Sequence, residues 1–177
     1  MQLFKTIQSF KWPFILWFYH ILLFLLCKNN IWALYNSYHT KQTELKKRVW
    51  NEYMKRHAAS ISIDAKIASP LILPHGVSGI FITQSAIIGS NVVCFQQVTI
   101  GANTIKWSKS YGAPVIEDNV YIGAGAKIIG AAHVGRNVRI GANAVVVTDV
   151  EANSVVVAEN RVIVKNHDLD NTFIPTL

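Results

Sequence analysis

The most regular feature of the sequence is an apolar residue at every sixth position through residues 82–150. Neither the helical period nor the alternation of a strand gives a period of six. A six-residue repeat is typical of a parallel β-helix, in which each hexad supplies one short strand and one tight turn. The apolar residue points into the core, and the small residue that follows it lets the backbone turn. The positions in register are Ile82, Ile88, Cys94, Ile100, Ile116, Ile122, Ile128, Val134, Ile140 and Val146.

Two insertions interrupt this register. The first adds three residues after Leu73 and contains His75, within the segment LPHGVSG. The second adds about ten residues, 106–115 (KWSKSYGAPV), between Ile100 and Ile116. Insertions into a solenoid project as loops from the stack and often carry its function. We therefore look for chemistry at these two places.

The first 57 residues differ in composition from the rest. They hold nine basic and two acidic side chains and so account for the net charge of +7, whereas the other 120 residues hold eight of each. Residues 12–27 form an aromatic-rich apolar run that falls short of the roughly 20 residues of a membrane-spanning helix. Residues 31–57 read as one amphipathic helix. The expected parts are a helical appendage over residues 1–57, a β-helix domain over residues 58–165 and a C-terminal tail over residues 166–177.

The appendage has the character of a membrane-surface segment. Apolar, aromatic-rich faces edged with basic residues are typical of helices that lie at the headgroup zone. Packing of these helices into an oligomer is the alternative that the pattern leaves open. Nucleic acid is not expected as a partner, because the region has no binding motif and too much aliphatic surface. Cys27 and Cys94 show no pairing pattern and no metal-ligand spacing, so we expect neither a disulfide nor a metal site.

Four segments of the chain resemble the left-handed β-helix acyltransferases. They are HGVSGIFITQSAIIGSN, FQQVTIGAN, GAPVIEDNVYIGAGAKIIG and VGRNVRIGANAVVVTDV. The likeness covers about residues 60–163 and is strongest to serine O-acetyltransferases and their relatives in bacterial surface-polysaccharide clusters. It implies a left-handed parallel β-helix, acetyl-CoA as the donor, and a homotrimer, alone or stacked on a second trimer. It also implies active sites in the clefts between neighbouring subunits.

His75 is the leading candidate for catalysis. Histidine is the side chain best suited to accept a proton near neutral pH, and His75 lies at a register break beside Gly76. The resemblance implies that His75 is the general base that deprotonates the acceptor hydroxyl, with direct transfer and no acyl-enzyme. The family's aspartate, fifteen residues before this histidine, is matched by Ser60. Asp64 is the nearest acid and is the candidate to orient the imidazole.

The resemblance also assigns candidate binding residues. Segments IGAGAKI and VRIGAN match the parts of the family that line CoA, and Arg139 stands where a lysine can meet a CoA phosphate. In the second insertion, Trp107 and Tyr111 are candidates for the acceptor because an aromatic ring can stack on a sugar. Gln84 matches a glutamate of the family cleft. The candidate CoA-binding residues are Gly101, Gly123, Ala124, Arg139 and Ala142.

The acceptor follows from where the sequence departs from this family. The Arg-His-Pro that helps to hold serine is matched by residues 112–114, which are Gly, Ala and Pro. The sequence therefore predicts an O-acetyltransferase that modifies a sugar hydroxyl of a capsule, a lipopolysaccharide or a precursor. It also predicts a cytoplasmic protein on the inner face of the cytoplasmic membrane. The alternatives are a serine O-acetyltransferase and a noncatalytic β-helix scaffold.

Removal of residues 1–30 is expected to release the protein from anionic liposomes, because this segment combines an apolar aromatic run with lysines. Cosedimentation of the full and the shortened chain with anionic and with neutral vesicles measures the effect. The neutral vesicles serve as the control for charge. Unchanged cosedimentation of the shortened chain would contradict a membrane role for this segment.

Overall fold

The structure of the chain, a computed structural model, describes residue 21 and residues 30–159. The expected C-terminal tail, 166–177, lies outside the described residues, as does the apolar run 12–27 apart from Ile21. Within the described part of the chain, no helix has the length and apolar character needed to cross a bilayer.

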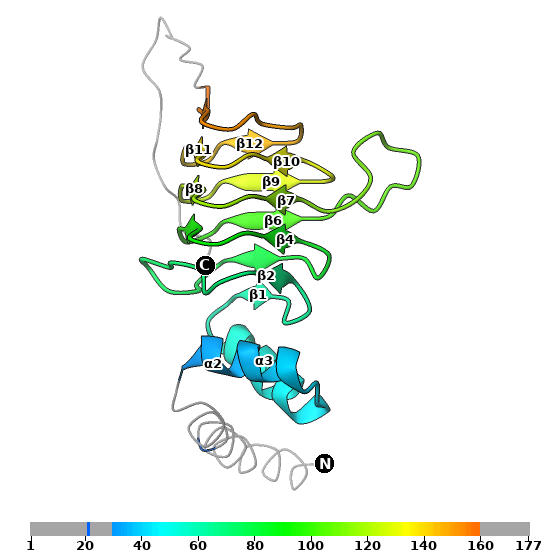
Figure 1. Cartoon of the computed structure of the whole chain (residues 1–177), viewed down its shortest axis with the longest axis vertical. Coiled ribbons are helices and arrows are strands. Elements are labelled where there is room, and N and C mark those ends of the chain that lie inside the picture. Colours follow the sequence, from blue (N-terminus) through cyan, green and yellow to red (C-terminus); the bar gives the residue numbers. More distant parts are fainter. Residues whose placement is uncertain (1–20, 22–29, 160–177) are drawn as a thin grey trace, which may run out of the picture.

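The predicted parallel β-helix is confirmed. Short strands stack in three sheets, and all of the pairings between them are parallel (Figure 1). The first sheet contains β1 (Ser60–Ile61), β3 (Phe81–Ile82), β6 (Thr99–Gly101), β9 (Lys127–Ile129) and β12 (Val145–Val146). The second contains β2 (Lys66–Ile67), β4 (Ile87–Ile88), β7 (Val115–Ile116) and β10 (His133–Val134). The third contains β5 (Val93–Cys94), β8 (Tyr121–Ile122), β11 (Arg139–Ile140) and β13 (Val155–Val156).

The chain passes through the three sheets in turn, so the prism has three corners. We call the turn from the first sheet to the second the first corner, the turn from the second to the third the second corner, and the turn from the third back to the first the third corner. Uninterrupted coils repeat after 18 residues, as the pairing of Phe81 with Thr99 shows. A residue's position in the coil therefore fixes the corner on which it lies.

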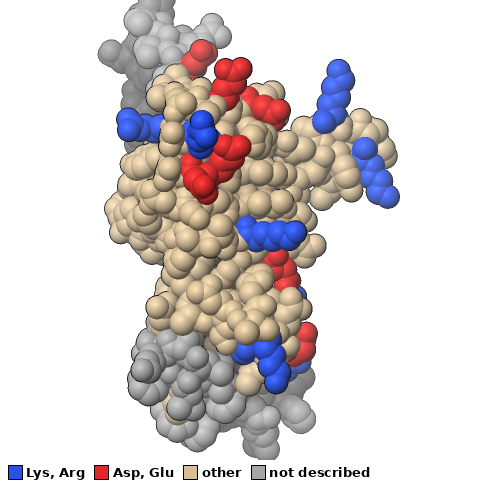
Figure 2. Space-filling view, viewed as in Figure 1, with Lys and Arg blue, Asp and Glu red and all other residues tan. Residues whose placement is uncertain are grey.

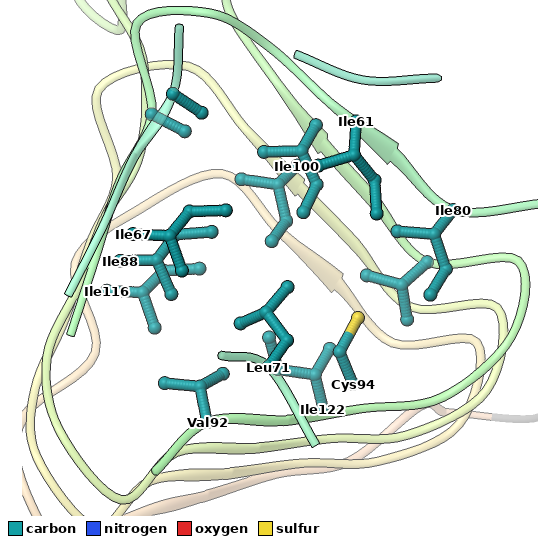
Figure 3. Close-up of a cluster of buried hydrophobic side chains, with 14 of the residues drawn as sticks. Ile61, Ile67, Leu71, Ile80, Ile88, Val92, Cys94, Ile100, Ile116 and Ile122 are labelled. Carbon is teal, nitrogen blue, oxygen red and sulfur yellow. The ribbon is translucent and has the colours of Figure 1, made fainter. Parts of the chain in front are cut away.

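The hexad residues predicted from the period fill the centre of the prism. Ile82, Ile100 and Ile128 lie directly above one another in the first sheet, and all three are buried. Figure 3 shows the inward side chains of successive coils stacked in the core, with the sulfur of Cys94 among them. Full burial of one such aliphatic side chain contributes roughly 1.5–3 kcal/mol, so the repeat itself is the main source of stability.

The glycines that follow the hexad residues have a different role from the one expected. Gly123 does not have a positive φ; instead, a Cβ added to it would lie 2.6 Å from the amide nitrogen of Ala142 in the next coil. In the described part of the chain, left-handed backbone occurs at five asparagines, such as Asn119 and Asn137 with φ of 60°, and at five glycines, none of which follows a hexad residue. Asparagine tolerates this conformation better than most residues. The repeated glycines therefore allow close approach of coils rather than the turn itself.

Residues 31–57 form two helices and not the single helix expected. They are α2 (Ile31–Thr40) and α3 (Glu44–Arg56). Asn30 caps α2 by accepting hydrogen bonds from the amides of Trp32 and Ala33. Thr43 begins α3, where its hydroxyl accepts from the amide of Lys46. A side chain that satisfies the free amides of a first turn favours a helix start at that point, and Thr43 therefore divides the segment.

The aromatic face of α2 and α3 covers the first coil of the prism. Trp50 is fully buried, and its indole nitrogen donates to the carbonyl of Ile61 at 2.6 Å. The hydroxyl of Tyr35 donates to the carbonyl of Ala65 at 2.6 Å and accepts from the amide of Ile67 at 2.9 Å. Between residues 31 and 56, much of the apolar face expected to meet a membrane or a sister subunit is therefore occupied by the chain's own β-helix.

Asp64 fastens both helices to the first coil. Its carboxylate accepts from Lys47 Nζ of α3 at 2.7 Å and from the hydroxyl of Tyr38 of α2 at 2.7 Å. The hydrogen bond from Lys47, followed by that from Tyr38, holds the pKa of Asp64 below its ordinary value of 3.8. Because the folded-state pKa is depressed, the stability that this contact contributes is present above the unfolded value and is lost as pH falls through the folded value.

Replacement Trp50→Ala is expected to lower the free energy of unfolding by about 3–5 kcal/mol, because it removes a large buried ring. It also leaves the carbonyl of Ile61 without its indole donor. Urea unfolding measures the change. Trp107→Ala is the matched control, since Trp107 is 89% exposed and its loss is expected to leave stability within about 0.5 kcal/mol. Equal effects of the two substitutions would contradict the packing role of Trp50.

Replacement Asp64→Asn is expected to lower the melting temperature at neutral pH and to have progressively less effect below pH 3.8. The wild type loses the benefit of its carboxylate on protonation, whereas asparagine has none to lose. Thermal unfolding between about pH 2 and pH 7 measures this convergence. Glu151→Gln, at an exposed position, is the control. A difference between Asp64→Asn and wild type that stays constant with pH would argue against an ionic contact.

Candidate active site

His75 lies on the third corner, in the turn between the third sheet and β3, with its side chain exposed. Its Nδ1 is 2.7 Å from Oε1 of Gln96, which lies on the same corner one coil further along the prism. The ring of Phe95 meets the imidazole edge-on, with 5.5 Å between ring centroids. Gly76 and Gly79, which flank the turn, both have a φ of 69°. The inserted residues thus place an exposed imidazole against the next coil.

Three of the candidate CoA-binding residues lie along the same corner. The amide of Gly125 donates to the carbonyl of Gln96 at 3.0 Å, and the amide of Asn143 donates to the carbonyl of Ala124 at 2.8 Å. These bonds join successive coils of the third corner, so Gly123, Ala124 and Ala142 continue the edge that starts at His75. Gly123 is buried on this edge, whereas Ala124 is half-buried and Ala142 is exposed, so a ligand can reach the edge at the two alanines.

Arg139 lies next to this edge, on the outer face of the third sheet. It is exposed and pairs in register with Tyr121 of β8. Tyr121 in turn packs against Phe95, with 5.2 Å between ring centroids. The rings of Phe95 and Tyr121 thus form an aromatic surface between His75 and Arg139. The guanidinium group of Arg139 can bind a phosphate with two parallel hydrogen bonds.

Gly101 is separated from the other CoA candidates. It ends β6 in the first sheet and therefore faces the first corner and not the third. A Cβ added to it would lie 3.0 Å from Cδ1 of Ile129. Within one chain, Gly101 does not lie on the edge that carries His75.

The prediction that Asp64 orients His75 is wrong within the chain. Asp64 lies in the turn between β1 and β2, on the first corner, where Lys47 and Tyr38 take up its carboxylate. The hydrogen-bond acceptor beside His75 is the amide oxygen of Gln96. The nearest acid in the sequence therefore serves the contact between the helices and the first coil.

The candidate acceptor residues of the insertion also lie on the first corner. The loop runs over residues 102–114 between β6 and β7, so Val115, which we expected within it, begins a strand (Figure 1). Its neck is closed by paired backbone bonds between Asn103 and Gly112, of 2.8 and 3.0 Å. Trp107 is 89% exposed and Tyr111 is 52% exposed.

The charge of this loop is basic. Lys106 and Lys109 are both exposed, and Figure 2 shows basic side chains on the projection of the loop. Gln84, the remaining acceptor candidate, lies in the turn after β3 and lines a hollow beside α3 together with Lys55 and Asp64. The acceptor candidates therefore share the first corner, whereas His75 lies on the third.

Sequence reasoning missed Gln96, Phe95 and Tyr121 as neighbours of His75. A signal was present in the coil length. Gln96 follows His75 by 21 residues, which is one coil of 18 plus the three residues of the first insertion. Counting 21 residues ahead of His75, one coil plus the insertion, would have identified the side chain beside it.

Cys94 is not a nucleophile in this arrangement. It is fully buried in the third sheet, and burial raises the pKa of its thiol from 9.0 to about 12. The reactive thiolate is therefore scarce at neutral pH. Among residues 30–159, no cluster of three or more histidine, cysteine or acidic side chains could hold a metal ion.

Residues 113–148 match the family model described as bacterial transferase hexapeptide (six repeats). A serine acetyltransferase from Bacillus licheniformis is 39% identical over 117 residues, which are 63% of this chain and 53% of the relative. The chain thus spans about half the length of this relative.

Two solved serine acetyltransferases share the fold over most of the chain. The enzyme from Neisseria gonorrhoeae in complex with serine superposes with a TM-score of 0.61 at 29% identity, covering 73% of this chain and 52% of that one. A serine acetyltransferase in complex with CoA gives 0.59 at 27% identity, covering 71% and 50%. The likeness to polysaccharide-modifying relatives stays a prediction. The chain is a hexapeptide-repeat protein whose parallel β-helix is similar to that of the serine acetyltransferases.

Proposed function

We propose that this protein is an acetyl-CoA-dependent O-acetyltransferase with His75 as its general base. The observation that carries the proposal is the third corner, where an exposed imidazole with an engaged Nδ1 begins an edge of small residues. Similarity to serine acetyltransferases, one solved with CoA and one with serine, supports the same donor and the same type of reaction.

In the proposed reaction, Nε2 of His75 takes the proton of an acceptor hydroxyl while the oxygen attacks the thioester carbonyl of acetyl-CoA. An alcohol is a weak nucleophile without such a base. The tetrahedral intermediate then collapses, the C–S bond breaks, and the CoA sulfur takes the proton from the imidazolium. The products are an acetyl ester and free CoA thiol, and no acyl-enzyme forms.

For the donor, we propose contacts from Gly123, Ala124 and Ala142 to the pantetheine arm and from Arg139 to a phosphate. The supporting observations are their positions along the His75 edge and the exposure of Arg139. The arm is met by backbone groups and small side chains, and the phosphate by a guanidinium.

We further propose a homotrimer in which the first corner of one subunit faces the third corner of its neighbour. Gly101, Gln84 and Trp107 lie on the first corner, away from His75 of the same chain. A three-fold arrangement of prisms would bring these residues to the His75 of a neighbouring subunit. Each active site would then be built from two chains, and a single chain would be incomplete.

Serine is the first acceptor to test, because it is the ligand of a similar solved structure. A saccharide hydroxyl is the second candidate, and one observation favours it. Trp107 presents 89% of its surface to solvent on the basic loop between β6 and β7, which suits stacking on a sugar ring. This second candidate includes a saccharide polymer as acceptor and a location at the inner membrane. The membrane location rests on the aromatic and basic character of residues 1–57.

Release of CoA thiol from acetyl-CoA is expected with serine or with a bacterial capsule oligosaccharide, and the product identifies the acceptor. His75→Gln is expected to lower kcat by about 10²–10⁴-fold, because it removes the base while keeping a polar side chain of similar size. His133→Gln, on the second sheet, is the matched control and should leave kcat unchanged.

The scaffold alternative gives a different result. A noncatalytic β-helix would release no thiol with any acceptor, and acetyl-CoA would not raise the melting temperature of the protein, as a bound ligand must. Full activity of His75→Gln would also overturn the proposal, since it would leave the reaction without its base.

A further inference from the structure

We propose that Gln96 is a positioning residue that fixes the tautomer and the orientation of His75, where a carboxylate does this work in the family that the sequence resembles. This inference rests on the proposed function, since it gives the imidazole a base's task. The observation that carries it is the hydrogen bond of 2.7 Å between His75 Nδ1 and Gln96 Oε1.

The chemistry of the two atoms determines the direction of this bond. With the amide oxygen of Gln96 toward the ring, Gln96 can only accept, so Nδ1 of His75 carries the proton in this arrangement. In a neutral imidazole only one nitrogen is protonated, and Nε2 is then left with the free lone pair. Gln96 therefore selects the tautomer in which Nε2 can accept a proton from a hydroxyl.

The position of Gln96 is itself fixed by the prism. Its carbonyl accepts the amide of Gly125 in the next coil at 3.0 Å. Phe95 packs on the imidazole on one side and on Tyr121 on the other. His75 is thus held by a hydrogen bond and an aromatic contact, both from a coil that is anchored to its neighbour. An exposed turn residue gains a defined ring orientation in this way.

Within one chain, the described contacts of His75 include no compensating negative charge. The groups packed on the imidazole are the amide of Gln96 and the ring of Phe95, with the phenol of Tyr121 behind it. One residue beyond Gln96, the carbonyl of Gln97 accepts a bond of 2.8 Å from Lys127 Nζ. Within one chain, an imidazolium formed during the reaction would therefore face the amide dipole of Gln96 and no carboxylate among these contacts. Ser60, at the position of the family's aspartate, lies in β1 and carries no charge.

Two substitutions of Gln96 separate its roles. Gln96→Leu keeps the approximate size but removes the acceptor, so Nδ1 loses its partner. Gln96→Glu keeps an acceptor and adds the negative charge that the site lacks. Gln97→Leu is the matched control, because it makes the same change at the adjacent exposed residue. Thermal unfolding of each variant verifies that the coil is intact.

The first readout is the ¹⁵N spectrum of the His75 ring in the full-length protein, assigned by comparison with His75→Gln. In wild type, the spectrum is expected to show the proton on Nδ1. That preference should be lost in Gln96→Leu and kept in Gln96→Glu and Gln97→Leu. In Gln96→Glu the midpoint of the ring titration should rise by about one pH unit, because a nearby opposite charge favours the imidazolium. His133, which pairs with Glu117 at 3.0 Å, is an internal control whose signals should not move.

The second readout is the pH dependence of acetyl transfer. Gln96→Leu should lower kcat about 10–100-fold with little change in the KM for acetyl-CoA, because it disturbs the base and not the donor site. Gln96→Glu should retain activity, with the acid limb of its rate profile moved to higher pH in step with the ring titration. Gln97→Leu should match wild type in both respects.

The two readouts keep the two proposals distinguishable. An unchanged tautomer in Gln96→Leu, or an unchanged ring titration in Gln96→Glu, would overturn the positioning role whether or not the protein is an enzyme. Wild-type protein that transfers no acetyl group, yet shows the expected ring spectra, would overturn the proposed function while supporting the contact. If Gln96→Leu does not fold, the titration of Gln96→Glu decides the inference alone.

Discussion

Each coil of the β-helix must present its backbone amides to the carbonyls of the next coil, and the rest of the structure depends on this stacking. The third sheet shows this in two successive hydrogen bonds of 2.9 Å. The amide of Val93 donates to the carbonyl of Val120, and the amide of Tyr121 donates to the carbonyl of Val138. Such close approach leaves no room for a Cβ at Gly123. It also restricts insertions to the corners, where a loop can leave and return without shifting the strands.

The same stacking gives a surface histidine a defined orientation. His75 lies in a turn, where side chains are usually mobile. Its partner Gln96 belongs to a regular coil, and the Gln96 carbonyl accepts a hydrogen bond from an amide of the next coil. Rigid scaffolds with functional side chains at their edges are a common arrangement in enzymes. In this molecule a residue of the scaffold, Gln96, is hydrogen-bonded directly to the proposed base.

The sequence was most informative where one physical rule acts alone. The inward positions, such as Ile100 and Ile128, follow from a fixed period, and the structure buries them as expected. The neighbours of His75 do not follow from the apolar period alone, because finding them requires the coil length and the three-residue insertion to be counted together. The hydrogen-bond partners of Asp64 were not predictable either. Its partners Lys47 and Tyr38 come from helices whose break at Thr43 the apolar pattern did not reveal.

The helices at the start of the prism have a further consequence for how copies of this protein can associate. The outermost strands of a parallel stack expose amides and carbonyls that could pair with the strands of another molecule. Here the indole of Trp50 and the hydroxyl of Tyr35 take up the carbonyls of Ile61 and Ala65 and the amide of Ile67. Aromatic side chains thus substitute for the coil that is missing at this end. At these positions the edge cannot accept a strand from another copy, which works against fibre growth through this end of the prism.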